Sequence, residues 1–221
     1  EEIVRILDTF TALENELEKQ LEAELAARTK QYEYYIHKLL FLSQKSIEPN
    51  VQSIKLGDIM HYSKESILAN QLDKTCYVGV DNLLQNKKGK VDSEYVPKNG
   101  RLIKYKKDDI LIGNIRPYLR KIWIADNEGG TNGDVLCIRV NKDAKAIAIP
   151  AYLYYVLSSE EFFTYAIKNS KGAKMPRGDK ALTMKFEFPL PSLEVQKQIV
   201  SILDRFDALV NNLKSGLPAE I

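Results

Sequence analysis

Cysteine and histidine are nearly missing from this sequence, which contains two of each in 221 residues. Cys76 and Cys137 lie in unrelated contexts, so we expect two buried thiols in a reducing compartment rather than a disulfide. Neither His37 nor His61 has a cysteine at a metal-ligand spacing, which favours packing or surface roles for both. The sequence therefore predicts no metal site and a cytoplasmic location.

Long apolar runs and glycine-rich phosphate motifs are missing as well. No run approaches the roughly 20 residues that a membrane-spanning helix needs, and neither a Gly-x-Gly-x-x-Gly nor a Walker A pattern occurs. The Asn/Asp-Pro-Pro-aromatic tetrapeptide of amino-methyltransferases is missing too. Asp143-Ala144-Lys145 lies in a predicted turn, without the strand that a nuclease metal site would need. We expect a non-catalytic chain without a cofactor, although a catalytic site built from scattered residues stays open.

The two ends of the sequence resemble each other. Residues 197–221 repeat residues 1–25 without a gap, and thirteen of the twenty-five aligned positions are identical. The matches include Ile3 with Ile199, Leu7 with Leu203 and Phe10 with Phe206. Such a repeat indicates one period of a longer pattern. Because residue 1 is Glu rather than Met, we expect the natural N-terminus to be missing.

Charge is divided unevenly along the chain. Residues 1–42 carry a net charge of −4 and residues 193–221 a net charge of −1, whereas residues 43–192 carry +7. A basic block suits a polyanion such as DNA or RNA, and acidic flanks would be repelled by it. A solvated, lysine-rich surface explains the same numbers equally well.

Both flanks read as helices. Residues 1–42 contain neither Gly nor Pro, and their apolar residues recur every three or four positions, as in a coiled coil. An unbroken helix of this length would span about 60 Å and would need a partner along its seam. We expect the helix over 193–221 to be that partner and Gly216-Leu217-Pro218 to break or kink it. The residues predicted to pair are Ile3, Phe10, Leu13, Leu17, Leu21, Ile199, Phe206, Leu209 and Leu213.

The block between the helices, 43–192, has a different texture. Short β-rich runs separated by turn signals predict strands at 51–54, 75–80, 101–105, 110–112, 121–125, 135–140 and 184–188. Residues 150–158 and 160–169 read as helices. The fold class is therefore α+β, with one globular domain built on a mixed, strongly bent sheet and flanked by long coiled-coil-like helices.

Positive charge gathers in two stretches of this block. The first, 98–121, has interleaved aromatic residues and a core of Gly113-Asn114-Ile115-Arg116-Pro117-Tyr118, which predicts a strand running into a tight turn. Arginine and asparagine can contact base edges or phosphates. The candidate DNA-binding residues here are Lys104, Lys106, Asn114, Arg116, Tyr118 and Arg120. The alternative is that Tyr118 packs and Arg116 pairs with an acid.

The second stretch, 168–185, has Gly172, Pro176 and Gly178 and one acid, Asp179, which predicts a basic loop able to follow a sugar–phosphate backbone. A mobile solvated loop is the alternative. Its candidate DNA-binding residues are Lys171, Lys174, Arg177 and Lys180.

Several segments resemble specificity subunits of type I restriction–modification systems. The sequence FPLPSLEVQKQIVSILD at 188–204 resembles their junction between domain and helix, and QYEYYIHKLL at 31–40 resembles the end of their spacer helix. The segment DILIGNIRPY at 109–118 resembles part of their target-recognition domain. The resemblance extends over essentially the whole chain and is most specific in the helices.

The resemblance implies a subunit with two recognition domains, each reading one half of a bipartite site in double-stranded DNA, and two antiparallel helices that set the spacing. It also implies that the helices dock methyltransferase subunits, which restriction subunits join. Catalysis would belong to those partners, which use S-adenosylmethionine, ATP and magnesium. This sequence holds one recognition domain only, over 43–192, so it is either a fragment or a half-subunit that pairs with itself through its helices. A nuclease or methyltransferase with a cryptic site, and a coiled-coil scaffold, are the alternative functions.

Overall fold

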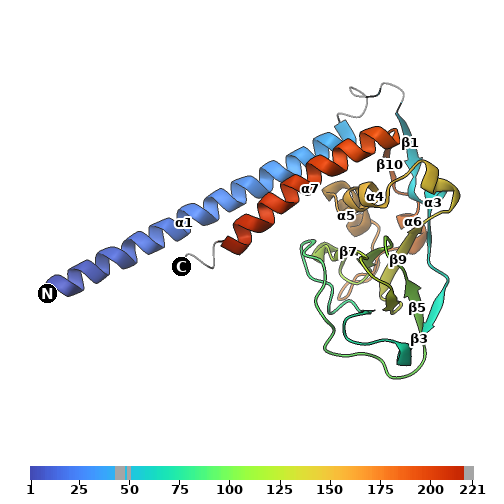
Figure 1. Ribbon diagram of the computed structural model, residues 1–221, viewed down its shortest axis with the longest axis horizontal. Helices are drawn as coiled ribbons and strands as arrows, with labels where there is room; N and C mark the ends of the chain where they lie inside the picture. Colours follow the sequence, from blue (N-terminus) through green and yellow to red (C-terminus); the bar gives the residue numbers. More distant parts are fainter. Residues whose placement is uncertain (43–47, 49–50, 217–221) are drawn as a thin grey trace.

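The N-terminal flank forms one long helix. The computed structural model describes residues 1–42, 48 and 51–216, with side chains to residue 208. Helix α1, Glu2–His37, is followed by a π-helical turn, η1, Lys38–Leu42. At 1.5 Å per residue its 36 residues span about 54 Å. Figure 1 shows it extending away from the globular part of the molecule, with the N-terminus at the far end.

The globular part contains all of the described strands. In chain order its elements are β1 (Gln52–Lys55), α3 (Leu56–Ile59), β2 (Met60–Tyr62), β3 (Ser66–Leu68), η2 (Ala69–Gln71), β4 (Tyr77–Val78), β5 (Arg101–Tyr105), β6 (Ile110–Gly113), η3 (Pro117–Leu119), β7 (Ile122–Ile124), β8 (Gly129–Thr131), β9 (Val135–Val140), η4 (Asp143–Ala146), α4 (Pro150–Leu157), α5 (Glu160–Lys168), α6 (Lys180–Thr183) and β10 (Glu187–Leu190). Helix α7, Leu193–Gly216, leaves the globule again.

The strands form two four-stranded sheets and one ribbon. One sheet has the order β2-β9-β6-β7 and is antiparallel throughout, whereas the other, β3-β5-β8-β4, includes a parallel pair between β4 and β8. Strands β1 and β10 form the antiparallel ribbon that brings the chain back to α7. The predicted α+β fold class is thus confirmed, and the β-structure, predicted as one mixed and strongly bent sheet, is divided between two sheets and a ribbon.

The β2-β9-β6-β7 sheet is buried on both faces. On β6, Ile110 and Ile112 belong to the core under the helices, whereas Leu111 between them packs into a second core that includes Tyr105 of β5. Alternate residues of a strand point to opposite faces, so the apolar run of β6 supplies both cores. This explains why β6 is almost wholly apolar.

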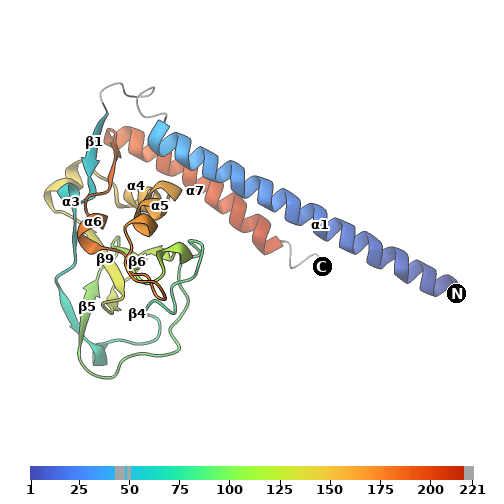
Figure 2. The same cartoon turned by 180° about the vertical axis from the view of Figure 1, so that it is seen from behind.

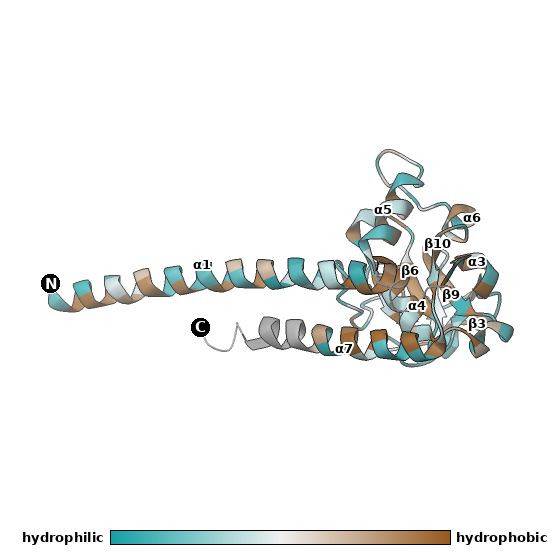
Figure 3. Cartoon of the chain, turned by 90° about the horizontal axis from the view of Figure 1, so that it is seen from above, coloured by the Kyte–Doolittle hydropathy of each residue, from teal (hydrophilic) through white to brown (hydrophobic). Residues whose placement is uncertain are grey.

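Helix α7 lies beside the second half of α1, and the two run antiparallel (Figures 1 and 2). The Phe206 ring stacks on Tyr35, with centroids 5.5 Å apart, and also contacts Tyr32. Figure 3 shows α1 continuing well beyond the coloured part of α7. Four residues predicted to pair, Ile3, Phe10, Leu13 and Leu17, are therefore exposed, and Leu21 is half-buried.

The predicted strands and helices of the globular part are present. Each of the seven predicted strands overlaps an observed one, and both predicted helices are present as α4 and α5, but β2, β3 and β8 were not predicted. The stretch 168–185 is not wholly a loop, because it contains the helical turn α6. The side chains of Leu209 and Leu213 lie outside the described residues. Of the expected break at Gly216-Leu217-Pro218, Gly216 is the last residue of α7, and the other two residues lie outside the described part of the chain.

Candidate DNA-binding surface

Two basic segments that are distant in sequence lie together at the end of strand β6. The chain leaves β6 at Gly113, passes through Asn114 and Arg116 into η3, and returns as β7. Beside it lies the segment that follows α5. We refer to residues 114–119 and 171–178 as the basic loop pair. Its cations are Arg116, Lys171, Lys174 and Arg177.

Main-chain hydrogen bonds join the two segments. The Arg116 amide donates to the Pro176 carbonyl over 2.7 Å, and the Gly178 amide donates to the Asn114 carbonyl over 3.0 Å. Ile115 and Arg177 form an antiparallel bridge between these two bonds. Within the second segment, Lys171 and Arg177 exchange two further bonds of 2.9 Å each. Within the predicted loop at 168–185, residues 171–178 therefore form a closed turn that is bonded to Asn114 and Arg116, ahead of η3.

Backbone conformation at Arg116 turns its side chain outward. Arg116 has φ 52° and ψ 64°, a left-handed conformation that costs a non-glycine residue about 1 kcal/mol or more. Its amide is bonded to the Pro176 carbonyl, and the next residue, Pro117, is buried. As a result Arg116 is exposed, and Tyr118 keeps 49% of its surface exposed two residues later.

Glycine is needed where the two segments approach most closely. A Cβ added at Gly178 would lie 2.7 Å from Oδ1 of Asn114, which is itself buried. Asn114 therefore packs under the surface, although it was a candidate for base contact. The Asn114 amide in turn donates to the Asp134 carbonyl over 2.9 Å, which attaches the loop pair to the segment between β8 and β9.

Carboxylates neutralise part of this surface. Arg177 pairs with Asp134 at 3.1 Å, and Lys171 pairs with Asp179 at 2.9 Å. The hydrogen bond between the latter two raises the pKa of Lys171 and lowers that of Asp179, so both remain charged near neutral pH. Asp179 also caps α6. Among the residues with described side chains, neither Arg116 nor Lys174 has an ion-pair partner.

The other candidate cations are occupied elsewhere. Lys104 pairs with Glu128 at 2.9 Å and Lys106 with Glu65 at 2.8 Å, both on or beside β5. Arg120 pairs with Glu160 of α5 at 2.7 Å, on the side of η3 that faces the helices. Lys180 begins α6, and its ammonium group lies 6.0 Å from the Tyr62 ring centre.

A second set of contacts docks α7 on the domain. Gln196 is fully buried: its Nε2 donates to the carbonyls of Ile147 and Pro191, both over 2.7 Å, and its Oε1 accepts from the Ile149 amide over 2.9 Å. About two turns farther along α7, the Tyr155 hydroxyl donates to Asp204 over 2.6 Å. Burial, and then this bond, raise the pKa of Tyr155.

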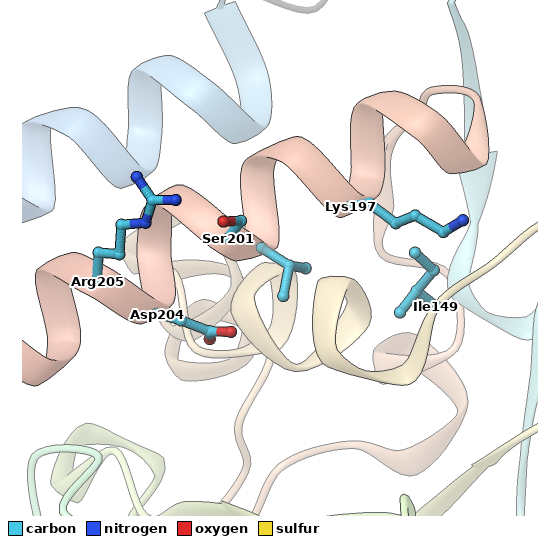
Figure 4. Close-up of a pocket in the computed structure, with 6 residues that line it drawn as sticks. Ile149, Lys197, Ser201, Asp204 and Arg205 are labelled. Atoms are coloured by element: carbon cyan, nitrogen blue, oxygen red, sulfur yellow. The ribbon is translucent and has the colours of Figure 1, made fainter.

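Figure 4 shows Asp204 pointing from α7 toward α4, beside a shallow groove of about 340 Å³ lined by Ile149, Lys197, Ser201 and Arg205. Neither Asp134 nor Gln196 was identified from the sequence. An isolated Asp or Gln carries no local signal of the segment that it will contact.

Two further observations concern the described residues only. No helix among them is both long enough and apolar enough to cross a membrane. No cluster of three or more His, Cys, Asp or Glu side chains in that part of the chain could hold a metal ion.

An α+β domain that presents a basic loop pair, joined by main-chain hydrogen bonds, and that is fixed to a pair of long helices has the arrangement expected of a nucleic-acid recognition domain on a helical arm. The profile of one family, the type I restriction modification DNA specificity domain, matches residues 48–221. The chain belongs to this family.

Relatives agree with this assignment. A type I restriction enzyme specificity subunit of Escherichia coli is 29% identical over 230 residues, which is 100% of this chain and 54% of that protein. Another, from Methanocaldococcus jannaschii, is 28% identical over 174 residues, covering 74% of this chain and 37% of that protein. A similar fold occurs in a solved structure from work on complex assembly and conformational transition of the type I R-M system. The TM-score is 0.72 at 13% sequence identity, and the match covers 99% of this chain and 54% of the other chain. The chain thus spans about half the length of the Escherichia coli protein.

Proposed function

We propose that this chain reads one half of a bipartite site in double-stranded DNA through its basic loop pair. The observation that carries the proposal is the joining of two basic segments, 114–119 and 171–178, by main-chain bonds into one surface. A surface whose backbone is already fixed loses little conformational entropy on binding. More of the free energy of its contacts therefore contributes to affinity. Its free cations would neutralise phosphates, while neighbouring groups contact base edges.

We assign the chain no catalytic role in this proposal. Methyl transfer and cleavage would belong to methyltransferase and restriction subunits docked through α1 and α7, with S-adenosylmethionine, ATP and magnesium used by those partners. The two relatives above are named as subunits of restriction enzymes, which supports a division of labour between chains. Such a complex would act on DNA in the cytoplasm.

The terminal repeat supports a second recognition domain in the assembly. In α7, Ile199 and Leu203 are buried, Asp204 bonds Tyr155 and Phe206 stacks on Tyr35. All four residues recur unchanged as Ile3, Leu7, Asp8 and Phe10, which are exposed on α1. The first half of α1 therefore carries the residues with which α7 docks. We propose that it pairs with a second copy of the chain, which restores two recognition domains and favours a palindromic bipartite site.

DNA binding is tested by selection from a pool of random duplexes with the purified chain. Enrichment of a defined sequence motif supports the proposal, and recovery of random sequences at the end of the selection contradicts it. The pairing of copies is tested by light scattering at micromolar concentration. We expect the mass of two chains, and that of one chain for Leu7→Glu, which alters an exposed position; a wild-type mass of one chain contradicts the pairing.

A further inference from the structure

One ion pair joins the basic loop pair to the neighbouring segment between β8 and β9. Nη2 of Arg177 lies 3.1 Å from Oδ1 of Asp134, and both side chains keep solvent contact, at 59% and 36% of their surface. The ion pair is therefore accessible to a large partner.

The backbone of both residues is fixed. Arg177 is bonded twice to Lys171 and bridged to Ile115. Asp134 accepts from the Asn114 amide through its carbonyl, and its own amide donates to Oδ1 of Asn132 over 3.0 Å. The ion pair with the Asp134 carboxylate at 3.1 Å favours this placement of the Arg177 guanidinium. An arginine positioned in this way has already lost part of the side-chain entropy that recognition would cost.

We propose that Arg177 and Asp134 together read one guanine–cytosine base pair from the major groove, an inference that rests on the proposed function. A guanidinium has five N–H donors, and the contact with Asp134 engages only part of them. Guanine presents O6 and N7 as two acceptors, which arginine can contact in a bidentate manner. The paired cytosine presents its N4 amino group, which a carboxylate can accept. The donors of Arg177 thus complement the acceptors of guanine, and the acceptor of Asp134 complements the donor of cytosine.

Charge argues against a phosphate as the ligand of Arg177. The Asp134 carboxylate cancels most of the attraction that Arg177 would exert on an anion and repels a phosphate that approaches it. A base edge is neutral and meets no such repulsion. Arg116 and Lys174, which have no ion-pair partner among the described side chains, fit the phosphate role better.

The test is the same random-duplex selection, run in parallel with the wild-type chain, Arg177→Ala, Arg177→Lys, Asp134→Ala and, as the control, Arg116→Ala. We expect the wild-type motif to contain a guanine–cytosine position at which Arg177→Ala and Arg177→Lys lose about ten- to hundred-fold in preference while the other positions are kept. Lysine retains the charge but lacks the planar fork, so it separates base reading from simple attraction. Arg116→Ala should weaken binding to all duplexes and leave the motif unchanged.

Asp134→Ala gives the sharpest readout. Without its carboxylate, Arg177 becomes a free cation, so affinity for unselected duplex should rise while preference at the same position falls. A purely structural Asp134 would lower both quantities. An unchanged motif in Arg177→Ala overturns this inference and leaves the proposed function standing, whereas the absence of any wild-type motif overturns both.

Discussion

Replacing Arg116 and Lys174 together by alanine removes the two cations of the basic loop pair that have no ion-pair partner among the described side chains. Each cation that neutralises a phosphate releases condensed counterions, so the logarithm of the association constant falls with the logarithm of salt concentration by about 0.9 per contact. Losing two contacts should make this slope shallower by about 1.8. A four-fold rise in salt would then cost the double variant about 12-fold less affinity than the wild type.

The measurement is fluorescence anisotropy with a labelled duplex across a salt series. Lys104→Ala with Lys106→Ala is the matched control, since it removes the same charge from residues that already pair with Glu128 and Glu65. Cations held by carboxylates have little net charge to give to phosphates, so the slope of the control should move by less than about 0.5. Equal changes of slope in the two double variants would refute the assignment of phosphate contacts to the loop pair.

The contacts that hold the domain together give three further predictions. Gln196→Ala should lower the free energy of unfolding, measured by urea denaturation, by about 2–4 kcal/mol, because it leaves buried polar groups without partners. The control is Gln198→Ala at an exposed position, which should change this free energy by less than about 0.5 kcal/mol. Arg139→Ala should lower the free energy of unfolding by about 3–5 kcal/mol, because it removes the ion-pair partner of the buried Asp109 carboxylate, which Arg139 binds over 2.8 and 2.7 Å. A smaller loss than for Gln196→Ala would contradict this. In native alkylation followed by mass spectrometry, Cys76 should react before Cys137, because burial raises the pKa of both thiols but Cys137 is much less accessible.

The helices were the most predictable part of this chain. Composition and the three-to-four spacing of apolar residues identify α1 and α7 without reference to any other segment, because helical hydrogen bonds are local. Strands β6 and β9 were also found, since their apolar runs are long. By contrast, the three-residue strands β2 (Met-His-Tyr), β3 (Ser-Ile-Leu) and β8 (Gly-Gly-Thr) were missed, because none has the β-branched and aromatic run of the equally short β7 (Ile-Trp-Ile).

The candidate site was predictable in charge but not in geometry. Both basic stretches were identified. The sequence could not indicate that the segments of Arg116 and Arg177 lie side by side, because main-chain bonds between residues distant in sequence join them. For the same reason Lys104, Lys106 and Arg120 looked like equivalent cations. Each is paired with an acid that is at least 24 positions away in sequence: Glu128, Glu65 and Glu160.

In the basic loop pair, backbone atoms hold the surface together, whereas side chains supply its charge. The bonds that join the two segments run between backbone groups of residues 114, 116, 176 and 178, and those that close the second segment run between residues 171 and 177. They therefore do not depend on which side chains these residues carry, apart from Gly178. The Arg116, Lys171, Lys174 and Arg177 side chains project from this frame and can be exchanged without breaking it. A frame with these properties suits a domain whose task is to recognise one DNA sequence among many, because the reading residues can differ while the fold, the helices and their docking by Gln196 and Asp204 stay the same.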